Sequence, residues 1–190
     1  VGGGYFLPKC PGNSGEYLGL TGKMLVGTEA LAVDLADFAI NSDNLADYWD
    51  SLTNNEMMSV DQRIARLHSV IDNAKLPEAS DWLSPEIDET FDFDTPAEIM
   101  QALIESGTHW ATETLTILQK RSPLMLHVSL RQIRQGRHMS LADELRLERT
   151  LVQHCFYTHH LGRTGVESET VEGIRALAVD KDHSPVWNPA

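Results

Sequence analysis

Residues 2–4 of this chain are three consecutive glycines, which could do chemistry through their backbone. Aromatic and apolar residues follow them directly in the opening VGGGYFLP, a pattern typical of a strand or loop that enters a packed helix. Glycine lets the backbone adopt a positive φ or approach a neighbour closely, and N–H groups at a helix start attract anions and oxyanions. The turn is therefore a candidate for close contact with such a group, and the pattern predicts that further chain precedes it.

The side chains that bind metals or transfer protons are scattered along the sequence. Of the eight histidines, His159 and His160 are adjacent, so on a helix or strand they point apart, and the others stand singly. The HExxH, CxxC, GxSxG and Walker patterns are missing. Cys10 and Cys155 are remote from each other, which favours buried apolar positions in a reducing compartment over a disulfide or metal site. The sequence therefore predicts no complete active site, no metal site and no bound cofactor.

Charge is distributed unevenly along the chain, whose formal net charge is −13. Residues 29–105 hold 18 acids against 3 bases, whereas residues 120–150 hold 7 bases against 3 acids. The negative balance argues against nucleic-acid binding, which needs a basic face. The basic stretch is most simply a solvated helix face, although an anionic small ligand would find its favourable field there. No apolar run approaches the ~20 residues that span a bilayer, so no membrane segment is expected.

Hydrophobic periodicity predicts a chain that is helical almost throughout. Thr95–Pro96 and Ser122–Pro123 each place an N-cap before a proline, and Gly107 and Gly136 are typical stops. Short extended segments are expected only at residues 24–26 and 38–40, and residues 75–94 indicate a connector with at most one helical turn. The predicted helices are 60–71, 96–105, 108–120, 123–135, 141–157 and 170–179.

Three groups of residues resemble one known family. They are VGGGYFLP with GLTG at 19–22, the stretch 122–136 from Ser-Pro to Arg-Gln-Gly, and the closing EGIRA, DKD and PVW of 172–187. In this order they resemble the enoyl-CoA hydratase/isomerase (crotonase) superfamily, and in particular its branch of 3-hydroxyisobutyryl-CoA hydrolases. The resemblance runs from end to end of the chain and is clearest at 12–41 and 122–187.

This resemblance implies a fold class and an activity. Family members build a spiral of β-β-α turns with a helical carboxy-terminal part, so the chain is expected to be mainly α, with little residual strand. Residues 1–57 would end the crotonase-like core, and residues 58–190 would form a helical oligomerisation region. In the branch, two backbone N–H groups bind the thioester oxygen while a carboxylate acts on water, which releases CoA and 3-hydroxyisobutyrate in valine breakdown.

The resemblance also assigns the site residues. In the family pattern the catalytic carboxylates and both oxyanion-hole segments lie upstream of the position of Val1, so no catalytic residue is expected here and the chain alone should be inactive. Residues 2–6 would form a wall of the acyl-CoA site, and Lys181 would meet the CoA phosphates or adenine, unless it is simply surface charge. The substrate-binding candidates are Gly2, Gly3, Gly4, Tyr5, Phe6 and Lys181.

Two other interpretations stay open: a family member with another acyl-CoA specificity, such as a hydratase, or a non-catalytic oligomerisation or interaction module. We expect a homo-oligomer, in the cytoplasm of a bacterium or the mitochondrial matrix of a eukaryote. Because residues 1–40 would pack on a β-spiral that this chain does not contain, we also expect them to expose apolar surface. The residues concerned are Tyr5, Phe6, Leu7, Tyr17, Leu18, Leu20 and Leu31.

Overall fold

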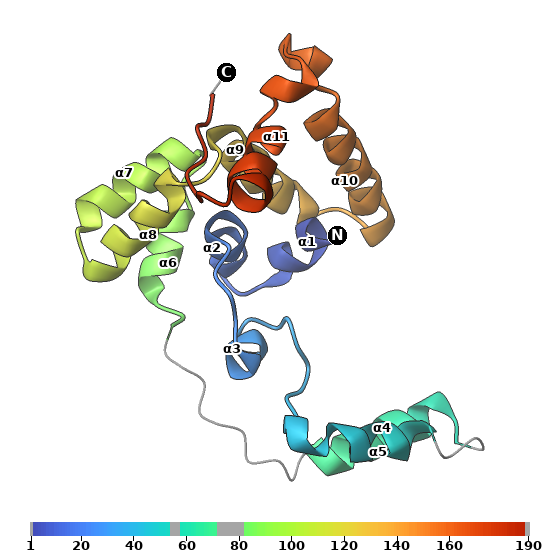
Figure 1. Ribbon diagram of the computed structural model, residues 1–190. Helices are drawn as coiled ribbons and strands as arrows, with labels where there is room; N and C mark the ends of the chain where they lie inside the picture. Colours follow the sequence, from blue (N-terminus) through green and yellow to red (C-terminus); the bar gives the residue numbers. More distant parts are fainter. Residues whose placement is uncertain (1, 54–57, 72–81, 189–190) are drawn as a thin grey trace. The chain divides into compact units, whose positions relative to one another are not determined.

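The computed structural model describes residues 2–53, 58–71 and 82–188. The chain forms two compact units, one made of Val1–Met24 with Ser84–Ala190 and the other of Leu25–Leu83 (Figure 1). All regular secondary structure in the described ranges is helical, which confirms the mainly α class. The boundaries of these units differ from the predicted division at residue 57. That division concerns packing in a larger protein, so it stays a prediction.

The first unit contains the helices that carry the candidate site. Their bounds are α1 Gly3–Phe6, α2 Ser14–Thr21, α6 Pro85–Phe91, α7 Pro96–Ser106, α8 His109–Gln119, α9 Pro123–Gly136, α10 Leu141–Phe156 and α11 Glu169–Ile174, which continues into a π-helical turn, Arg175–Val179. The second unit contains α3 Gly27–Ala32, α4 Leu45–Thr53 and α5 Val60–Ile71. The six predicted helices are therefore confirmed.

Local caps explain where several of these helices begin and end. Thr95 Oγ1 accepts the N–H of Glu98 at 3.2 Å, and the Glu98 carboxylate accepts the N–H of Thr95 at 3.0 Å. Ser122 Oγ accepts the N–H of Met125 at 3.0 Å where α9 begins, and Gly107 ends α7 with a φ of 61°. Each capping oxygen satisfies an N–H that the first turn of a helix leaves unpaired, so short stretches of sequence determine these ends.

Helix α2 lies at the centre of the first unit, where it contacts α6, α8 and α9 (Figure 1). Tyr17, Leu18 and Leu20 are buried, and the ring of Tyr17 meets that of Phe91 edge-on with centroids 5.3 Å apart. The expectation that these three residues expose apolar surface was therefore wrong, because helices that follow residue 84 cover α2. The other residues of that expectation are partly buried, except for the exposed Phe6.

Two other local expectations were also wrong. Residues 24–26 and 38–40 form no strand, because an isolated extended segment has no neighbour to pair its backbone groups. The predicted connector contains the two-turn helix α6, capped by Ser84, whose Oγ accepts the N–H of Glu86 at 3.2 Å. Its buried Ile87 and Phe91 explain why this acidic stretch folds as a helix against α2. Residues 72–81 of the predicted connector lie outside the described residues.

Candidate functional site

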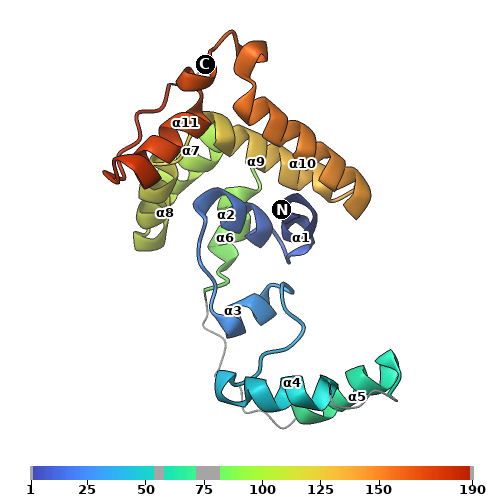
Figure 2. The ribbon, with the colours of Figure 1, turned by 45° about the vertical axis from the view of Figure 1, so that its right-hand side comes forward.

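The glycine turn is tied to α10 by a carboxylate. Gly2 has a φ of 81°, in the left-handed region that favours glycine, and its N–H is directed to both carboxylate oxygens of Glu148, at 2.8 and 2.9 Å. Figure 2 shows α1 beside α9 and α10, both of which contact it. The N–H of Gly2 is thus satisfied within the chain.

Gly4 is buried where α1 packs against α9 and α10. A Cβ at this position would lie 2.3 Å from Glu144 Oε1 and 2.6 Å from Gln132 Nε2. Gln132 donates to that same Glu144 oxygen at 2.7 Å, while Glu144 Oε2 is buried without a hydrogen-bond partner among the described residues. A side chain at position 4 would make Gln132 and Glu144 move, so helix packing favours glycine here. The sequence pattern alone does not separate this reason from ligand contact.

The predicted substrate-binding residues lie at the start of the chain and on the carboxy-terminal segment. The ammonium of Lys9 lies 3.3 Å from the centroid of the Tyr5 ring, and Phe6 is 51% exposed. Lys181 is exposed on the carboxy-terminal segment, with a φ of 57°. None of the predicted residues lines any of three cavities in the described part of the first unit. Their role as a wall of a site stays a prediction.

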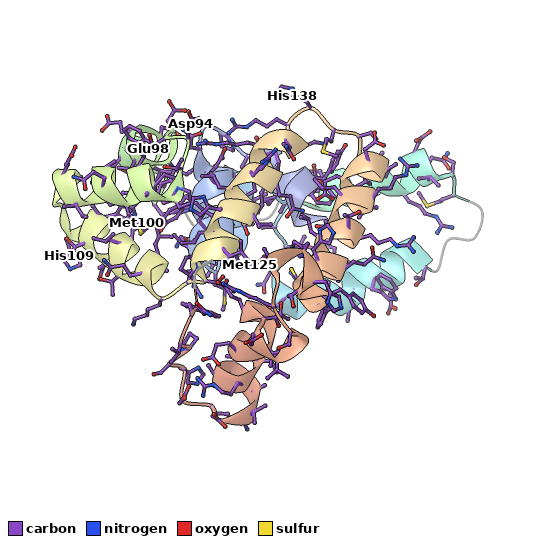
Figure 3. The ribbon with its side chains drawn as sticks, turned by 90° about the horizontal axis from the view of Figure 1, so that it is seen from above. Asp94, Glu98, Met100, His109, Met125 and His138 are labelled. Carbon is purple, nitrogen blue, oxygen red and sulfur yellow. The ribbon has the colours of Figure 1, made fainter. Side chains whose placement is uncertain are left out.

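A cavity of about 690 Å³ lies elsewhere, between the end of α2, the start of α9 and the carboxy-terminal segment. Met125, labelled in Figure 3, reaches it from α9. The volume lies in the range of small-molecule sites, which are mostly apolar with a few polar groups. The lining residues are Gly19, Leu20, Gly22, Lys120, Arg121, Ser122, Met125, Leu126, Ser129, Glu169, Thr170, Gly173, Ile174, Ala176, Leu177, Ala178, His183, Pro185 and Trp187.

Basic residues line part of this mostly apolar cavity, whose wall also contains hydroxyl groups and the carboxylate of Glu169. Arg121 Nη2 donates to the carbonyl of Thr21, which joins the start of α9 to the end of α2. Lys120 and His183 also contribute to the lining, and the carbonyl of Lys120 accepts the indole N–H of Trp187 at 3.0 Å. This combination suits a ligand with an apolar part and an anionic part, because apolar walls remove hydrocarbon from water while cations attract the anion.

Glu169 is a buried carboxylate that lines the same cavity and a smaller one of about 130 Å³. Neither of its carboxylate oxygens has a hydrogen-bond partner within the described part of the chain. Burial raises the pKa of Glu169, and the positive charge of Arg163 opposes that rise. The cavity wall therefore contains an acid that is easier to protonate than an exposed glutamate.

Arg175 organises the end of the chain next to the cavity. Its Nε and Nη2 donate to the two oxygens of Glu172 at 2.9 and 2.7 Å, and Nη1 donates to Asp180 and Asp182 at 2.6 and 2.8 Å. The hydrogen bonds from Arg175, together with one from the N–H of Val186, lower the pKa of Glu172 to about 2. The same carboxylates raise the pKa of Arg175.

Sequence reasoning did not identify this arrangement or the cavity. The EGIRA and DKD motifs supplied the one available signal, since they place an arginine among the acids of residues 172–182. Their spacing did not predict that an irregular tail folds back onto the helix.

The candidate metal ligands are not brought together. No group of three or more His, Cys, Asp or Glu residues that could hold a metal ion occurs in the described ranges 2–53, 58–71 and 82–188. His109 and His138 lie on separate parts of the molecule (Figure 3). Cys10 is buried and Cys155 partly buried, and the two do not form a disulfide with each other. No helix among the described residues is long and apolar enough to cross a bilayer.

Comparison with known proteins gives a consistent result. The chain matches the family described as "Enoyl-CoA hydratase/isomerase" over residues 1–190. It is 34% identical to "3-hydroxyisobutyryl-CoA hydrolase, mitochondrial" of Gallus gallus, covering 100% of this chain and 48% of that protein. It is 36% identical to "3-hydroxyisobutyryl-CoA hydrolase 1" of Arabidopsis thaliana, covering 100% of this chain and 50% of that protein. The chain thus spans about half the length of the curated relatives it matches.

Two solved structures likewise match nearly all of this chain with about half of their own length. An enoyl-CoA hydratase from Rhodobacter sphaeroides 2.4.1 superposes with a TM-score of 0.76 at 30% identity, covering 99% of this chain and 50% of that one. A carnitinyl-CoA dehydratase from Mycobacterium thermoresistibile gives the same TM-score and identity, with 98% and 49% coverage. Both names refer to enzymes that act on CoA thioesters.

Proposed function

Because this chain belongs to the enoyl-CoA hydratase/isomerase family, we propose that it is part of an acyl-CoA thioester hydrolase whose substrate is 3-hydroxyisobutyryl-CoA. The observation that carries the proposal is the similarity, along the whole chain, to relatives that bear that enzyme's name. The cavity next to α9 supports it, because its apolar lining and basic residues suit an acyl thioester joined to an anionic nucleotide.

In this proposal the chain binds the acyl-CoA substrate and forms part of the wall of its site, but it does not supply the groups that cleave the thioester. Hydrolysis of a thioester builds negative charge on the carbonyl oxygen, which preorganised donors stabilise in the transition state. We place those donors and the carboxylate that acts on water outside this chain, as the family pattern implies. Residues 2–6 and Lys181 keep their proposed role as substrate contacts, and acyl-CoA is the substrate rather than a resident cofactor.

Release of free CoA thiol from 3-hydroxyisobutyryl-CoA tests the proposal. A longer protein that contains this chain with the upstream family segments should release thiol well above the uncatalysed rate, whereas the 190-residue chain alone should not. Turnover by the chain alone would show that the catalytic groups lie inside it. A longer protein that releases no thiol would contradict the hydrolase assignment.

A hydratase is the second candidate, favoured by the names of the two solved structures. Loss of the absorbance of an enoyl-CoA double bond measures that reaction separately from thiol release. If a longer protein hydrates enoyl-CoA without freeing thiol, the hydratase replaces the hydrolase as the proposed function. If the longer protein catalyses neither reaction, the interpretation that stays is the non-catalytic interaction module.

We further propose that the protein forms homo-oligomers and acts in the mitochondrial matrix, or in the cytoplasm if its source is a bacterium. Relatives from animals that are named mitochondrial support the first location. Exposed apolar side chains on α10, among them Val152 and Phe156, support association. Light scattering at several concentrations tests association, and a strictly monomeric protein would contradict it.

A further inference from the structure

We propose that Arg175 is a positioning residue that holds residues 180–187, which we name the strap, as one wall of the 690 Å³ cavity, and that ligand binding in the cavity depends on it. The identity of the ligand, an acyl-CoA, rests on the proposed function. The claim that Arg175 holds the strap in place does not rest on the proposed function, because it follows from contacts within the described residues.

Residues 180–186 of the strap are held by the guanidinium of Arg175 and the carboxylate of Glu172. Arg175 Nη1 reaches the carboxylates of Asp180 and Asp182, and Nη2 donates to the carbonyl of Ser184 at 3.1 Å. Glu172, itself bound by Arg175, accepts the N–H of Val186 at 2.6 Å. The planar fork of arginine can serve several acceptors at once, which the ammonium of lysine cannot do with the same geometry. Arg175 is therefore the group on which the position of residues 180–186 depends.

The other end of the strap is fixed to a different helix. The indole N–H of Trp187 donates to the carbonyl of Lys120, which follows α8, at 3.0 Å. The ring of Trp187 also packs beside Gly173 of α11, where a Cβ would lie 3.5 Å from it. Three residues of the strap, His183, Pro185 and Trp187, line the cavity. The strap thus connects the carboxy-terminal helix to the end of α8 and closes one side of the site.

The backbone of the strap shows that tertiary contacts hold it. Lys181 and His183 have φ values of 57° and 53°, in the left-handed region that residues other than glycine rarely adopt. Such conformations persist where the surroundings enforce them. The N–H of His183 donates to the carbonyl of Ala176 at 3.1 Å, which adds a contact to the helix but none that replaces Arg175. Removing the guanidinium should therefore release the segment that lines the cavity.

Four variants test this inference. Arg175→Ala removes the guanidinium, Arg175→Lys keeps the charge without the fork, and Trp187→Phe keeps an aromatic ring without the N–H. Arg146→Ala is the matched control, because Arg146 also forms an ion pair at 2.6 Å, with Asp143, but contacts no residue of the strap. Hydrogen exchange at the amides of Ser184 and Val186 measures the order of the strap, and exchange in α7 and α8 reports whether each variant is folded. Calorimetric titration with isobutyryl-CoA measures binding.

In Arg175→Ala we expect the Ser184 and Val186 amides to exchange at least tenfold faster, while the exchange rates in α7 and α8 stay unchanged. This variant should also bind isobutyryl-CoA at least tenfold more weakly. Arg175→Lys and Trp187→Phe should fall between this variant and the unmodified protein, and Arg146→Ala should match the latter. Unchanged exchange in Arg175→Ala would overturn the positioning role. If the unmodified protein binds no isobutyryl-CoA while Arg175→Ala still frees the strap, the positioning role stands and the proposed acyl-CoA function of the cavity fails.

Discussion

Glu172 accepts hydrogen bonds from Arg175 and from the backbone of Val186, so its charged form is favoured in the folded protein. Its pKa is lowered from the ordinary 4.5 to about 2, and that of Asp182 is lowered by the same guanidinium. A carboxylate whose folded pKa is depressed stabilises the fold above its unfolded pKa, and this contribution disappears as the pH falls through the folded pKa. The order of residues 180–187 should therefore be lost between about pH 4.5 and pH 2.

This prediction is checked by amide exchange or amide NMR shifts of Ser184 and Val186 over that pH range. In Glu172→Gln the loss at low pH should be smaller, because the titrating carboxylate is gone, and the strap should be less ordered at pH 7. Amides of Val186 that stay protected at pH 2 in the unmodified protein would contradict the role given to this carboxylate.

Glu169 presents the opposite case, since burial without a hydrogen-bond partner among the described residues raises its pKa. Such an acid weakens the fold while it is charged, and that cost disappears as the pH falls through the raised pKa. Glu169→Gln should therefore stabilise the protein at pH 7 by no more than about 1 kcal/mol, because Arg163 and nearby solvent reduce the cost. The gain should vanish below about pH 4.

Thermal unfolding at pH 7 and pH 4 measures this effect. The matched control is Glu167→Gln, because the Glu167 carboxylate accepts hydrogen bonds from Thr164 and its pKa is lowered. That variant should lose stability at pH 7, which is the opposite sign. Equal shifts in the two variants would show that the environment of Glu169 is not the cause.

At the scale of elements, the contact between α1 and α9 depends on two glycines that meet. A Cβ on Gly136 would lie 1.9 Å from the carbonyl oxygen of Gly4 and 3.0 Å from Pro8 Cγ, and a backbone oxygen cannot move aside as a side chain can. Gly136→Ala should therefore destabilise the protein by about 1–3 kcal/mol, the usual range for overpacking, or by more. Chemical denaturation measures the loss.

Gly3→Ala provides the comparison on α1, the other helix of this contact. No atom lies within 4 Å of a Cβ at Gly3, and alanine has the higher helix propensity. This variant should be neutral or slightly more stable. Similar losses in both variants would mean that the α1–α9 contact does not carry the stability assigned to it.

At the scale of the whole molecule, the first unit has a core of its own. Helices α2, α6, α8 and α9 pack together within it, and the buried Leu20, Phe91, Leu118 and Leu130 belong to them. We therefore predict that replacing Leu25–Leu83 with a long Gly/Ser linker leaves this unit folded. Circular dichroism and amide exchange of α7–α9 should remain close to those of the full chain.

In contrast, deletion of α6, Pro85–Phe91, should prevent the first unit from folding. It removes Ile87 and Phe91, which are 1% and 0% exposed, so the core around α2 would lose two fully buried side chains. A linker variant that unfolds as readily as the α6 deletion would show that residues 25–83 are needed by the first unit.

The sequence by itself determined the family, the mainly α class and the ends of six helices. Capping at Thr95, Ser122 and Ser140 acts over three or four residues, so its pattern is complete in any short window of the chain. The same reasoning failed at residues 24–26 and 38–40, because a strand exists only when another segment pairs with it.

Tertiary structure decided what contacts what. Tyr17 and Leu20 are buried because helices more than sixty residues away in sequence cover α2, and Gly4 lies against side chains of α9 and α10. The cavity and the strap held by Arg175 likewise join segments from both ends of the chain. Local patterns do not encode such meetings, since burial, close approach and shared hydrogen bonds depend on which distant elements pack together.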